Sequence, residues 1–159
     1  MTIEDDIALL ERVPSFAELG HDALRVLAIG SESRTLQRGE TLFYEGDIAD
    51  SGYVIEEGLL SAAPRARSAR RVMMARGTLV GELSLLTETR RPVTVTAEEP
   101  SSVMRIPRAL FVKMLQGYPH VAERLRQSMI TRSERLADDL GAIRQALDIA
   151  PAPDADAKS

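Results

Sequence analysis

The sequence contains no cysteine and only two histidines, and these absences exclude several kinds of chemistry. Without cysteine the chain can form no disulfide, thiol nucleophile or zinc–thiolate site. His21 and His120 stand far apart, and no carboxylate cluster with metal-ligand spacing accompanies either, so we interpret both as surface or helix-capping residues. The sequence also lacks a P-loop and a serine in a nucleophile elbow. We therefore expect neither an enzyme nor a metal or cofactor site.

Long hydrophobic runs are also missing. No stretch approaches the ~20 apolar residues of a membrane span. The first six residues, 1–6, are acidic overall and lack the basic and apolar regions of a signal peptide. A cytoplasmic location without membrane contact is therefore expected. The net charge of −4 argues against nucleic-acid binding by the chain as a whole, although a local basic patch could still act.

The 159 residues, of which 44% are hydrophobic, suffice for one domain with a sizeable core. Apolar spacing predicts a helix over 3–10, a break at 13–16, and a second helix from His21 to Ile29. From 31 to 107 the pattern changes to short apolar runs between glycines, which is typical of an antiparallel barrel or jelly roll. The glycines are Gly39, Gly46, Gly52, Gly58, Gly77 and Gly81.

Two further helices are predicted after Pro107, so that the C-terminal helices occupy 108–147. The first stops near Gly117, and the second begins at Pro119 and can continue to Leu147. That helix would be roughly 45 Å long, which is longer than a small barrel can cover. Its narrow apolar seam either packs on the barrel alone or pairs with a second copy, and we favour a homodimer. The seam consists of Leu125, Met129, Leu136, Leu140, Ile143 and Leu147. Residues 1–147 are assigned to the domain, and 148–159, rich in Ala, Pro and Asp, are predicted to be a disordered tail.

The segment from Val80 to Leu86 carries the clearest functional signal. It reads as a loop entering a short helix, and a helix start attracts phosphate through its unpaired N–H groups. Gly81 allows the backbone to approach a ligand closely. Arg91, nine residues after Glu82, can neutralise a phosphate with a planar pair of donors from the next strand. A carboxylate does not suit a phosphate, so Glu82 is predicted to face a sugar hydroxyl, and phosphate with ribose indicates a nucleotide.

This segment, with Thr94–Ala97 after it, resembles the phosphate-binding cassette of cyclic nucleotide-binding domains, the sensory modules of catabolite-activator-type and Fnr-type regulators, kinase regulatory subunits and some channels. The resemblance extends over about 9–140 and includes 39–47, 52–58 and 103–111. It implies a mainly β fold, a β-roll flanked by N-terminal helices and a long C-terminal helix. It also implies a ligand, cAMP or cGMP, held by Gly81, Glu82, Leu83, Ser84, Arg91, Pro92 and Val93.

Two positions depart from the cassette pattern. After the arginine the family usually has Ser, Thr or Ala and then Ala, whereas this chain has Pro92 and Val93. Proline offers neither an N–H nor a hydroxyl, so at least one expected phosphate donor is lost. One charge-assisted hydrogen bond corresponds to roughly 1.5–3 kcal/mol, or about ten- to a hundredfold in affinity. The site is therefore weakened, altered or vestigial.

The favoured function is a stand-alone regulatory module in signal transduction. Ligand would close the cassette, the cassette would contact the hinge near Pro107 and Phe111, and the long helix would move. In resembling proteins this helix often presents polar side chains to the base, and the corresponding candidates here are Ser128, Thr131, Arg132 and Ser133. Because 148–159 is too short for a helix-turn-helix domain, direct DNA reading is not expected.

Two alternatives remain open. Pro92 and Val93 also fit a protein-interaction module with a degenerate nucleotide site. Five arginines fall between 65 and 76, and this run is either a solvated hairpin loop or a docking patch for an acidic partner or anion. These are Arg65, Arg67, Arg70, Arg71 and Arg76.

Overall fold

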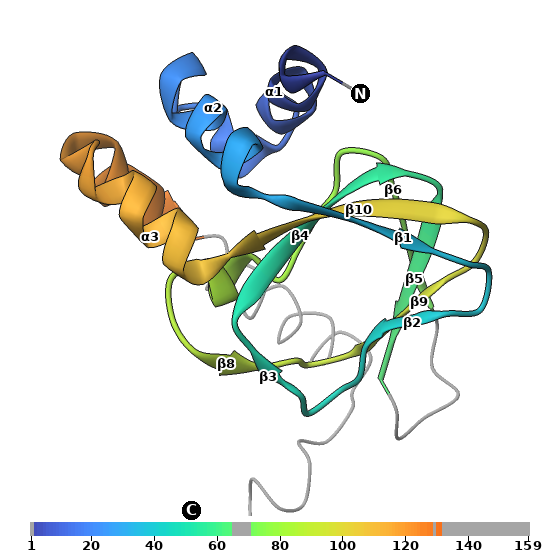
Figure 1. Cartoon of the computed structure of the whole chain (residues 1–159). Coiled ribbons are helices and arrows are strands. Elements are labelled where there is room, and N and C mark those ends of the chain that lie inside the picture. The colour runs from blue at the N-terminus through green and yellow to red at the C-terminus, as the bar shows by residue number, and fades with distance from the viewer. Residues whose placement is uncertain (1, 65–70, 129, 132–159) are drawn as a thin grey trace, which may run out of the picture.

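The computed structural model of the chain describes residues 2–64, 71–128 and 130–131. Helices gather at one end of the molecule and strands form a roll at the other (Figure 1). The helical elements before the roll are α1 (Ile3–Glu11), the 3₁₀ turn η1 (Pro14–Phe16) and α2 (His21–Gly30). The roll is followed by α3 (Arg108–Gln116).

The roll consists of two four-stranded antiparallel sheets and one two-stranded sheet. The first sheet has the order β1-β10-β4-β7 and consists of β1 (Glu32–Leu36), β10 (Ser101–Pro107), β4 (Ser51–Glu57) and β7 (Leu79–Val80). The second has the order β2-β9-β5-β6 and consists of β2 (Thr41–Phe43), β9 (Thr94–Ala97), β5 (Leu59–Ala63) and β6 (Val72–Ala75). The short pair is β3 (Ile48–Ala49) with β8 (Thr89–Arg90).

Alternation along β4 divides the apolar side chains between two cores. Tyr53 and Ile55 point into the roll, whereas Val54 between them packs against the helices. The core of the roll consists of Leu36, Leu42, Phe43, Tyr53, Ile55, Leu60, Val80, Val95, Ala97 and Val103. Because both faces of the β1-β10-β4-β7 sheet are covered, its central strands are almost wholly buried.

The second core holds the helices on the outer face of this sheet. The rings of Phe16 in η1 and Phe111 in α3 lie 5.8 Å apart, so the helices before and after the roll touch there. Gly30 at the end of α2 permits a close crossing, because a Cβ there would lie 2.6 Å from Leu110 of α3. The same core includes Met104, Ile106 and Leu125. Helix α3 is thus fixed to α2 as well as to the end of β10.

The predicted fold, a β-roll flanked by helices, is confirmed. The helix predicted over 119–147 is described only in part, and residues 119–128 and 130–131 are helical. The rest of that helix, the 148–159 segment and most of the arginine run, 65–70, lie outside the described residues. Within the described ranges, no helix has both the length and the apolar character that crossing a membrane requires.

Candidate ligand-binding site

The predicted cassette connects β7 of the first sheet to β9 of the second, and its η2 turn contacts β4 and α3. Gly81 follows β7 and leads into a 3₁₀ turn, η2 (Glu82–Leu85). Arg91 was predicted on a strand, but it lies directly after β8 and before β9. A four-residue turn has little of the dipole that the sequence argument ascribed to a helix start, so the positive charge at this place comes from Arg91.

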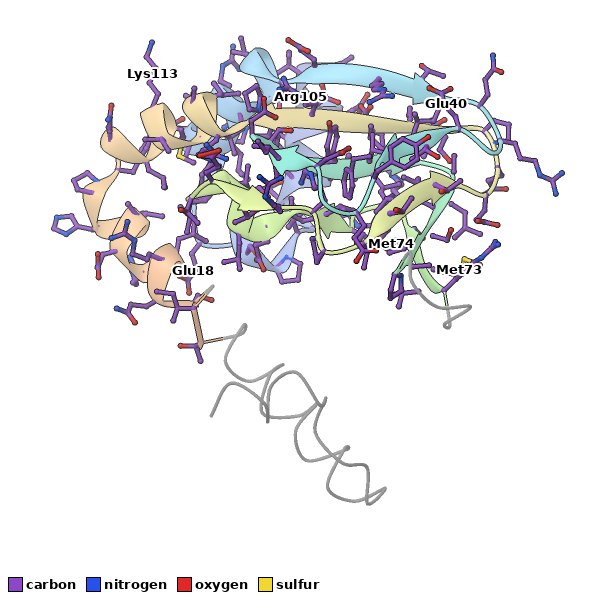
Figure 2. The ribbon with its side chains drawn as sticks, turned by 90° about the horizontal axis from the view of Figure 1, so that it is seen from below. Glu18, Glu40, Met73, Met74, Arg105 and Lys113 are labelled. Carbon is purple, nitrogen blue, oxygen red and sulfur yellow. The ribbon has the colours of Figure 1, made fainter. Side chains whose placement is uncertain are left out.

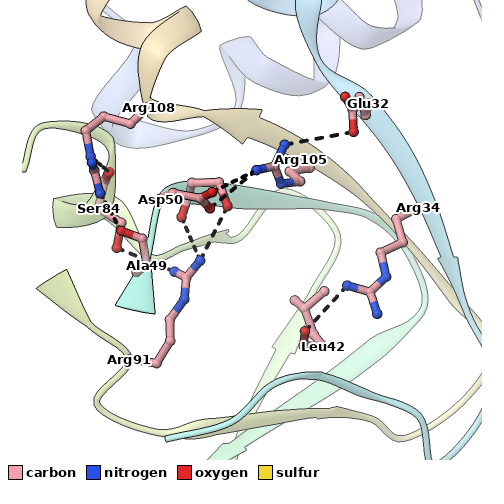
Figure 3. A network of polar contacts seen from close by, with 10 residues as sticks. Glu32, Arg34, Leu42, Ala49, Asp50, Ser84, Arg91, Arg105 and Arg108 are labelled. Atoms are coloured by element: carbon pink, nitrogen blue, oxygen red, sulfur yellow. Dashed lines mark hydrogen bonds and ion pairs between the residues drawn. The ribbon is translucent and has the colours of Figure 1, made fainter. Parts of the chain in front are cut away.

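Arg91 is buried, with 5% of its surface exposed, and its guanidinium binds the protein itself. Nη2 donates to the carbonyl oxygen of Ser51 at 2.9 Å and lies 3.4 Å from Ser51 Oγ. Nη1 donates to Ser84 Oγ at 3.4 Å. Figure 3 shows the guanidinium turned toward the start of β4, with Ser84 on its other side. Both terminal nitrogens of Arg91 therefore have acceptors in the absence of ligand.

Aromatic rings cover the guanidinium of Arg91. Its central carbon lies 4.2 Å from the ring centre of Phe43 and 5.6 Å from that of Tyr53. The two rings are themselves 6.0 Å apart and tilted, and both belong to the core of the roll. Such cation–π contacts stabilise a desolvated guanidinium, but they do not neutralise it.

No carboxylate compensates the charge of Arg91 directly, since none of the ion pairs among the described residues includes it. Burial lowers the pKa of Arg91, while the electrostatic effects of Tyr53, Asp50 and Asp47 oppose this change. An arginine nevertheless stays protonated at neutral pH. The cassette therefore contains a buried, unneutralised cation, for which an anionic ligand would be the natural counter-ion.

Gly81 determines whether Arg91 can lie in this position. The glycine has φ +81° and ψ 42°, a left-handed conformation that side chains disfavour. A Cβ on Gly81 would lie 2.5 Å from Nη1 of Arg91 and 3.3 Å from the carbonyl oxygen of Ser51. The sequence predicted a close approach of Gly81 to a ligand, and in the structure the group that approaches closely is the arginine.

Glu82 is half-buried and accepts a hydrogen bond from Ser15 Oγ in η1. The contact ties the cassette to the N-terminal helices across 67 positions of sequence. Its predicted partner, a ribose hydroxyl, stays a prediction. Leu83 is exposed to 41%, whereas Ser84 is buried and its Oγ also lies 3.0 Å from Thr89 Oγ1.

The backbone around Arg91 is held on both sides. The N–H of Arg91 donates to the carbonyl of Asp47, and the carbonyl of Arg91 accepts from the N–H of Gly46, each at 2.8 Å. Arg90 points the other way, is exposed, and donates to the carbonyl of Gly46 at 3.0 Å. The two neighbouring arginines thus differ, one being exposed and the other buried.

The two unusual residues after Arg91 have different surroundings. Pro92 is exposed, and Val93 is half-buried against the core of the roll. The residue after the arginine therefore presents an apolar ring to solvent and has no donor of its own. The ligand roles predicted for Pro92 and Val93 stay predictions.

Sequence reasoning missed the groups that hold Arg91 in place. Ser51 acts through its carbonyl oxygen, a group that every residue has, so no sequence signal marks it. Phe43 and Tyr53 lie in glycine-punctuated segments that indicated strands but not a contact with the cassette. Over the part of the chain that the structure describes, no group of three or more His, Cys, Asp or Glu could hold a metal ion.

Comparison with known proteins finds a family match that includes the cassette. The sequence model of the family described as "Cyclic nucleotide-binding domain" matches residues 33–118. The N-terminal domain of a transcriptional regulator from Streptomyces coelicolor A3(2) is similar in structure, with a TM-score of 0.70 at 30% identity, over 83% of this chain and 94% of that one. A cyclic nucleotide-binding-like protein from Brucella abortus is similar over 70% of this chain and 98% of that one, with a TM-score of 0.64 at 32% identity.

Curated relatives are larger proteins. An uncharacterised NTE family protein of Mycobacterium tuberculosis is 30% identical over 157 residues, which is 93% of this chain and 26% of that protein. Lysophospholipase NTE1 of Chaetomium globosum is 29% identical over 104 residues, which is 64% of this chain and 7% of that protein. The chain thus spans about a quarter or less of the length of these relatives.

Proposed function

The chain belongs to the cyclic nucleotide-binding domain family, and we propose that it is a regulatory module that binds a cyclic purine nucleotide at Arg91 and responds by moving its C-terminal helices. The observation that carries the proposal is the guanidinium of Arg91, which is buried without a carboxylate partner among the described residues. The phosphodiester of a cyclic nucleotide carries a single negative charge and two free oxygens, which match the paired donors of one arginine.

Binding requires a rearrangement of the contacts described above. A phosphate must take Nη1 and Nη2 of Arg91 from Ser84 and Ser51, and it must approach an edge of the guanidinium, because the Phe43 ring covers one face. The internal contacts of Arg91 thus compete with the ligand. If only a fraction of the molecules has Arg91 available, the apparent affinity falls by that fraction.

The remaining assignments follow from the proposal. Glu82 would exchange the Ser15 hydroxyl for a ribose hydroxyl, because a carboxylate accepts a hydrogen bond from either. The base would contact the helix that follows Pro119, where Ser128 and Thr131 are exposed and where Arg132 and Ser133 lie outside the described residues. A homodimer through this helix, a cytoplasmic location, and the absence of catalysis and of direct nucleic-acid or membrane contact belong to the same proposal.

A second function is favoured by a specific observation, namely that Arg91 already has protein acceptors and a covering ring. On this reading, the arginine is a structural residue of a protein-interaction module, and Pro92 and Val93 mark a degenerate site. The curated relatives include a lysophospholipase in which the matched region makes up only 7% of the protein. A region of that size beside a much larger remainder is compatible with a protein-interaction module.

A thermal-shift panel separates the two functions. The purified protein is melted with cAMP, cGMP, 5′-AMP, adenosine and inorganic phosphate at millimolar concentration. A ligand that binds only the folded state raises the melting temperature, and at a hundredfold excess over its Kd it adds about 2.7 kcal/mol of stability. The regulatory module predicts a shift with a cyclic nucleotide and none with adenosine. No shift with either cyclic nucleotide would favour the interaction module.

A further inference from the structure

Three arginines from different parts of the chain, the β8–β9 connection, β10 and α3, hold the same short segment, Ala49–Ser51, at the junction of β3 and β4 (Figure 3). Arg91 donates to the carbonyl of Ser51, and Arg105 of β10 donates to both carboxylate oxygens of Asp50 at 3.3 Å. Arg108 donates through Nη2 to the carbonyl of Ala49. The position of this segment is therefore sensitive to all three side chains.

Ser84 is a second partner that two of these arginines share. Its hydroxyl accepts from Arg91 Nη1 at 3.4 Å, and its carbonyl accepts from Arg108 Nε at 2.8 Å. Arg91 and Arg108 thus reach the same residue of η2 from opposite sides, as Figure 3 shows. A change in the hydrogen-bond partners of Arg91 therefore affects Ser84 and the Ala49–Ser51 segment, which Arg108 also contacts.

Arg108 is the first residue of α3, and its own N–H donates to the carbonyl of Asp50 at 2.8 Å. Side chain and backbone of this one residue therefore fix the start of α3 to Ala49, Asp50 and Ser84. The rest of α3 packs on α2 through Leu110 and on η1 through Phe111. A displacement of Ser84 or of the Ala49–Ser51 segment would accordingly move α3 as a unit.

We infer that Arg108 is a positioning residue that transmits occupancy of Arg91 to helix α3, with Ser84 as the shared joint. The inference rests on the proposed function, since it needs an anion at Arg91. When a phosphate takes the donors of Arg91, the carbonyl of Ser51 loses the Arg91 hydrogen bond, and the hydroxyl of Ser84 loses Arg91 and keeps Thr89 Oγ1. Both groups are buried, so the Ser51 carbonyl must move toward a new partner or toward water, and Ser84 keeps its contacts with Thr89 and Arg108. Arg108 holds the carbonyls of Ser84 and Ala49 and therefore carries that movement into α3.

The absence of cysteine from the sequence allows a direct test with spin labels. Lys113 of α3 and Glu40 before β2 are both exposed, and Figure 2 shows them at opposite ends of the molecule. The full chain carrying Lys113→Cys and Glu40→Cys is labelled, and the distance between labels is measured by pulsed electron resonance with and without cAMP or cGMP. Binding is measured on the same samples by calorimetry.

The expected result is a ligand-dependent change of the label distance in the parent protein. Arg108→Ala should abolish this change while cyclic nucleotide still binds. The affinity should stay within about tenfold of the parent, because the coupling free energy between the ligand site and α3 is small and its loss can change the affinity only by that amount. Arg108→Lys keeps the charge but places its donors on a single nitrogen, so it should restore part of the change, and it also covers the case in which the alanine variant fails to fold. Arg105→Ala, an arginine that holds the same segment without contacting Ser84, serves as the matched control and should keep the change.

The outcomes separate the two claims. Absence of binding to the parent protein would overturn the proposed function and, with it, the inference. Binding by Arg108→Ala or Arg108→Lys with the full distance change would overturn the inference alone. Loss of the change in Arg105→Ala to the same extent as in Arg108→Ala would also overturn it, because transmission would then not pass specifically through Arg108.

Discussion

The guanidinium of Arg91 lies 4.2 Å from the ring centre of Phe43, so the central cation of the cassette is stacked inside the roll and not displayed at its surface. The ring and the buried Ser51 carbonyl together hold the arginine in the absence of ligand. Binding of an anion is therefore an exchange of partners, and its strength depends on how readily Arg91 releases its internal partners.

Replacing Gly81 with Ala should destabilise the protein and disturb Arg91. The left-handed φ of +81° strains any side chain, and the new Cβ would also lie 2.5 Å from Nη1 of Arg91. We expect the free energy of unfolding in urea to fall by roughly 1–3 kcal/mol. Gly77→Ala is the matched control, because Gly77 has φ +89° but nothing within 4 Å of its Cβ position. Equal losses in the free energy of unfolding for the two variants would show that the contact of the new Cβ with Arg91 does not contribute to the destabilisation.

Replacing Phe43 with Leu should uncover Arg91. The smaller side chain keeps an apolar group in the core but removes the ring from the face of the guanidinium, so the affinity for cyclic nucleotide in calorimetry should rise. The free energy of unfolding should fall by about 1–3 kcal/mol, because a buried ring and a cation–π contact are lost. Tyr53→Phe, which keeps the second ring, should leave affinity unchanged. A lower affinity in Phe43→Leu would instead place the Phe43 ring among the ligand contacts.

The double variant Pro92→Ser with Val93→Ala should strengthen ligand binding. It returns an N–H and a hydroxyl to the position after Arg91 and removes bulk beside it. Regaining one charge-assisted hydrogen bond corresponds to roughly ten- to a hundredfold in affinity, measured by titration with cAMP and cGMP. The single change Val93→Ala separates bulk from donors. Unchanged or lower affinity in the double variant would mean that proline suits a different ligand.

The free energy of unfolding should vary with pH because of Glu56, a residue of β4 that is only 3% exposed. Burial raises the pKa of Glu56, the Ser33 hydroxyl at 2.8 Å opposes this effect, and the negative charges of Asp6 and Glu57 add to it. Because the folded pKa lies above the unfolded one, the folded state binds more protons between the two values. The stabilisation from Glu56 is therefore complete below the unfolded pKa and is lost as the pH rises through the folded pKa.

Glu56→Gln removes this dependence and provides the test. Relative to the wild type, the variant should gain stability as the pH is raised across that interval, as measured by urea unfolding at a series of pH values. Glu57→Gln changes an exposed neighbour on the same strand and should show no such gain. Parallel pH profiles for Glu56→Gln and the wild type would contradict the prediction.

Local features of the fold and of the cassette were predictable, because helix spacing, glycine turns and the Gly81-to-Arg91 pattern all lie within short stretches of sequence. The contacts of Arg91 were not predictable. Ser51 is 40 positions away and acts through its backbone.

The inward orientation of Phe43 in the roll was also not predictable from the sequence. Alternation predicts that Leu42 and Phe43 face opposite sides, yet both are buried in the core of the roll. The register between β2 and β9 shifts between Thr41 and Phe43, and this irregularity turns the ring inward over the arginine. A bulge of this kind depends on tertiary packing, and the residues around it carry no local signal.

The most direct test of the central claim is a calorimetric titration of cAMP and cGMP into the wild type, Arg91→Ala and Arg90→Ala, with circular dichroism to verify folding. Arg91 lies buried in the cassette, whereas Arg90 is exposed and bonded to Gly46, so the two variants remove the same charge one residue apart. We predict that at least one cyclic nucleotide binds the wild type and Arg90→Ala, and that binding is lost in Arg91→Ala. Undiminished binding in a folded Arg91→Ala variant would contradict the account, as would the absence of binding to the wild type at millimolar nucleotide.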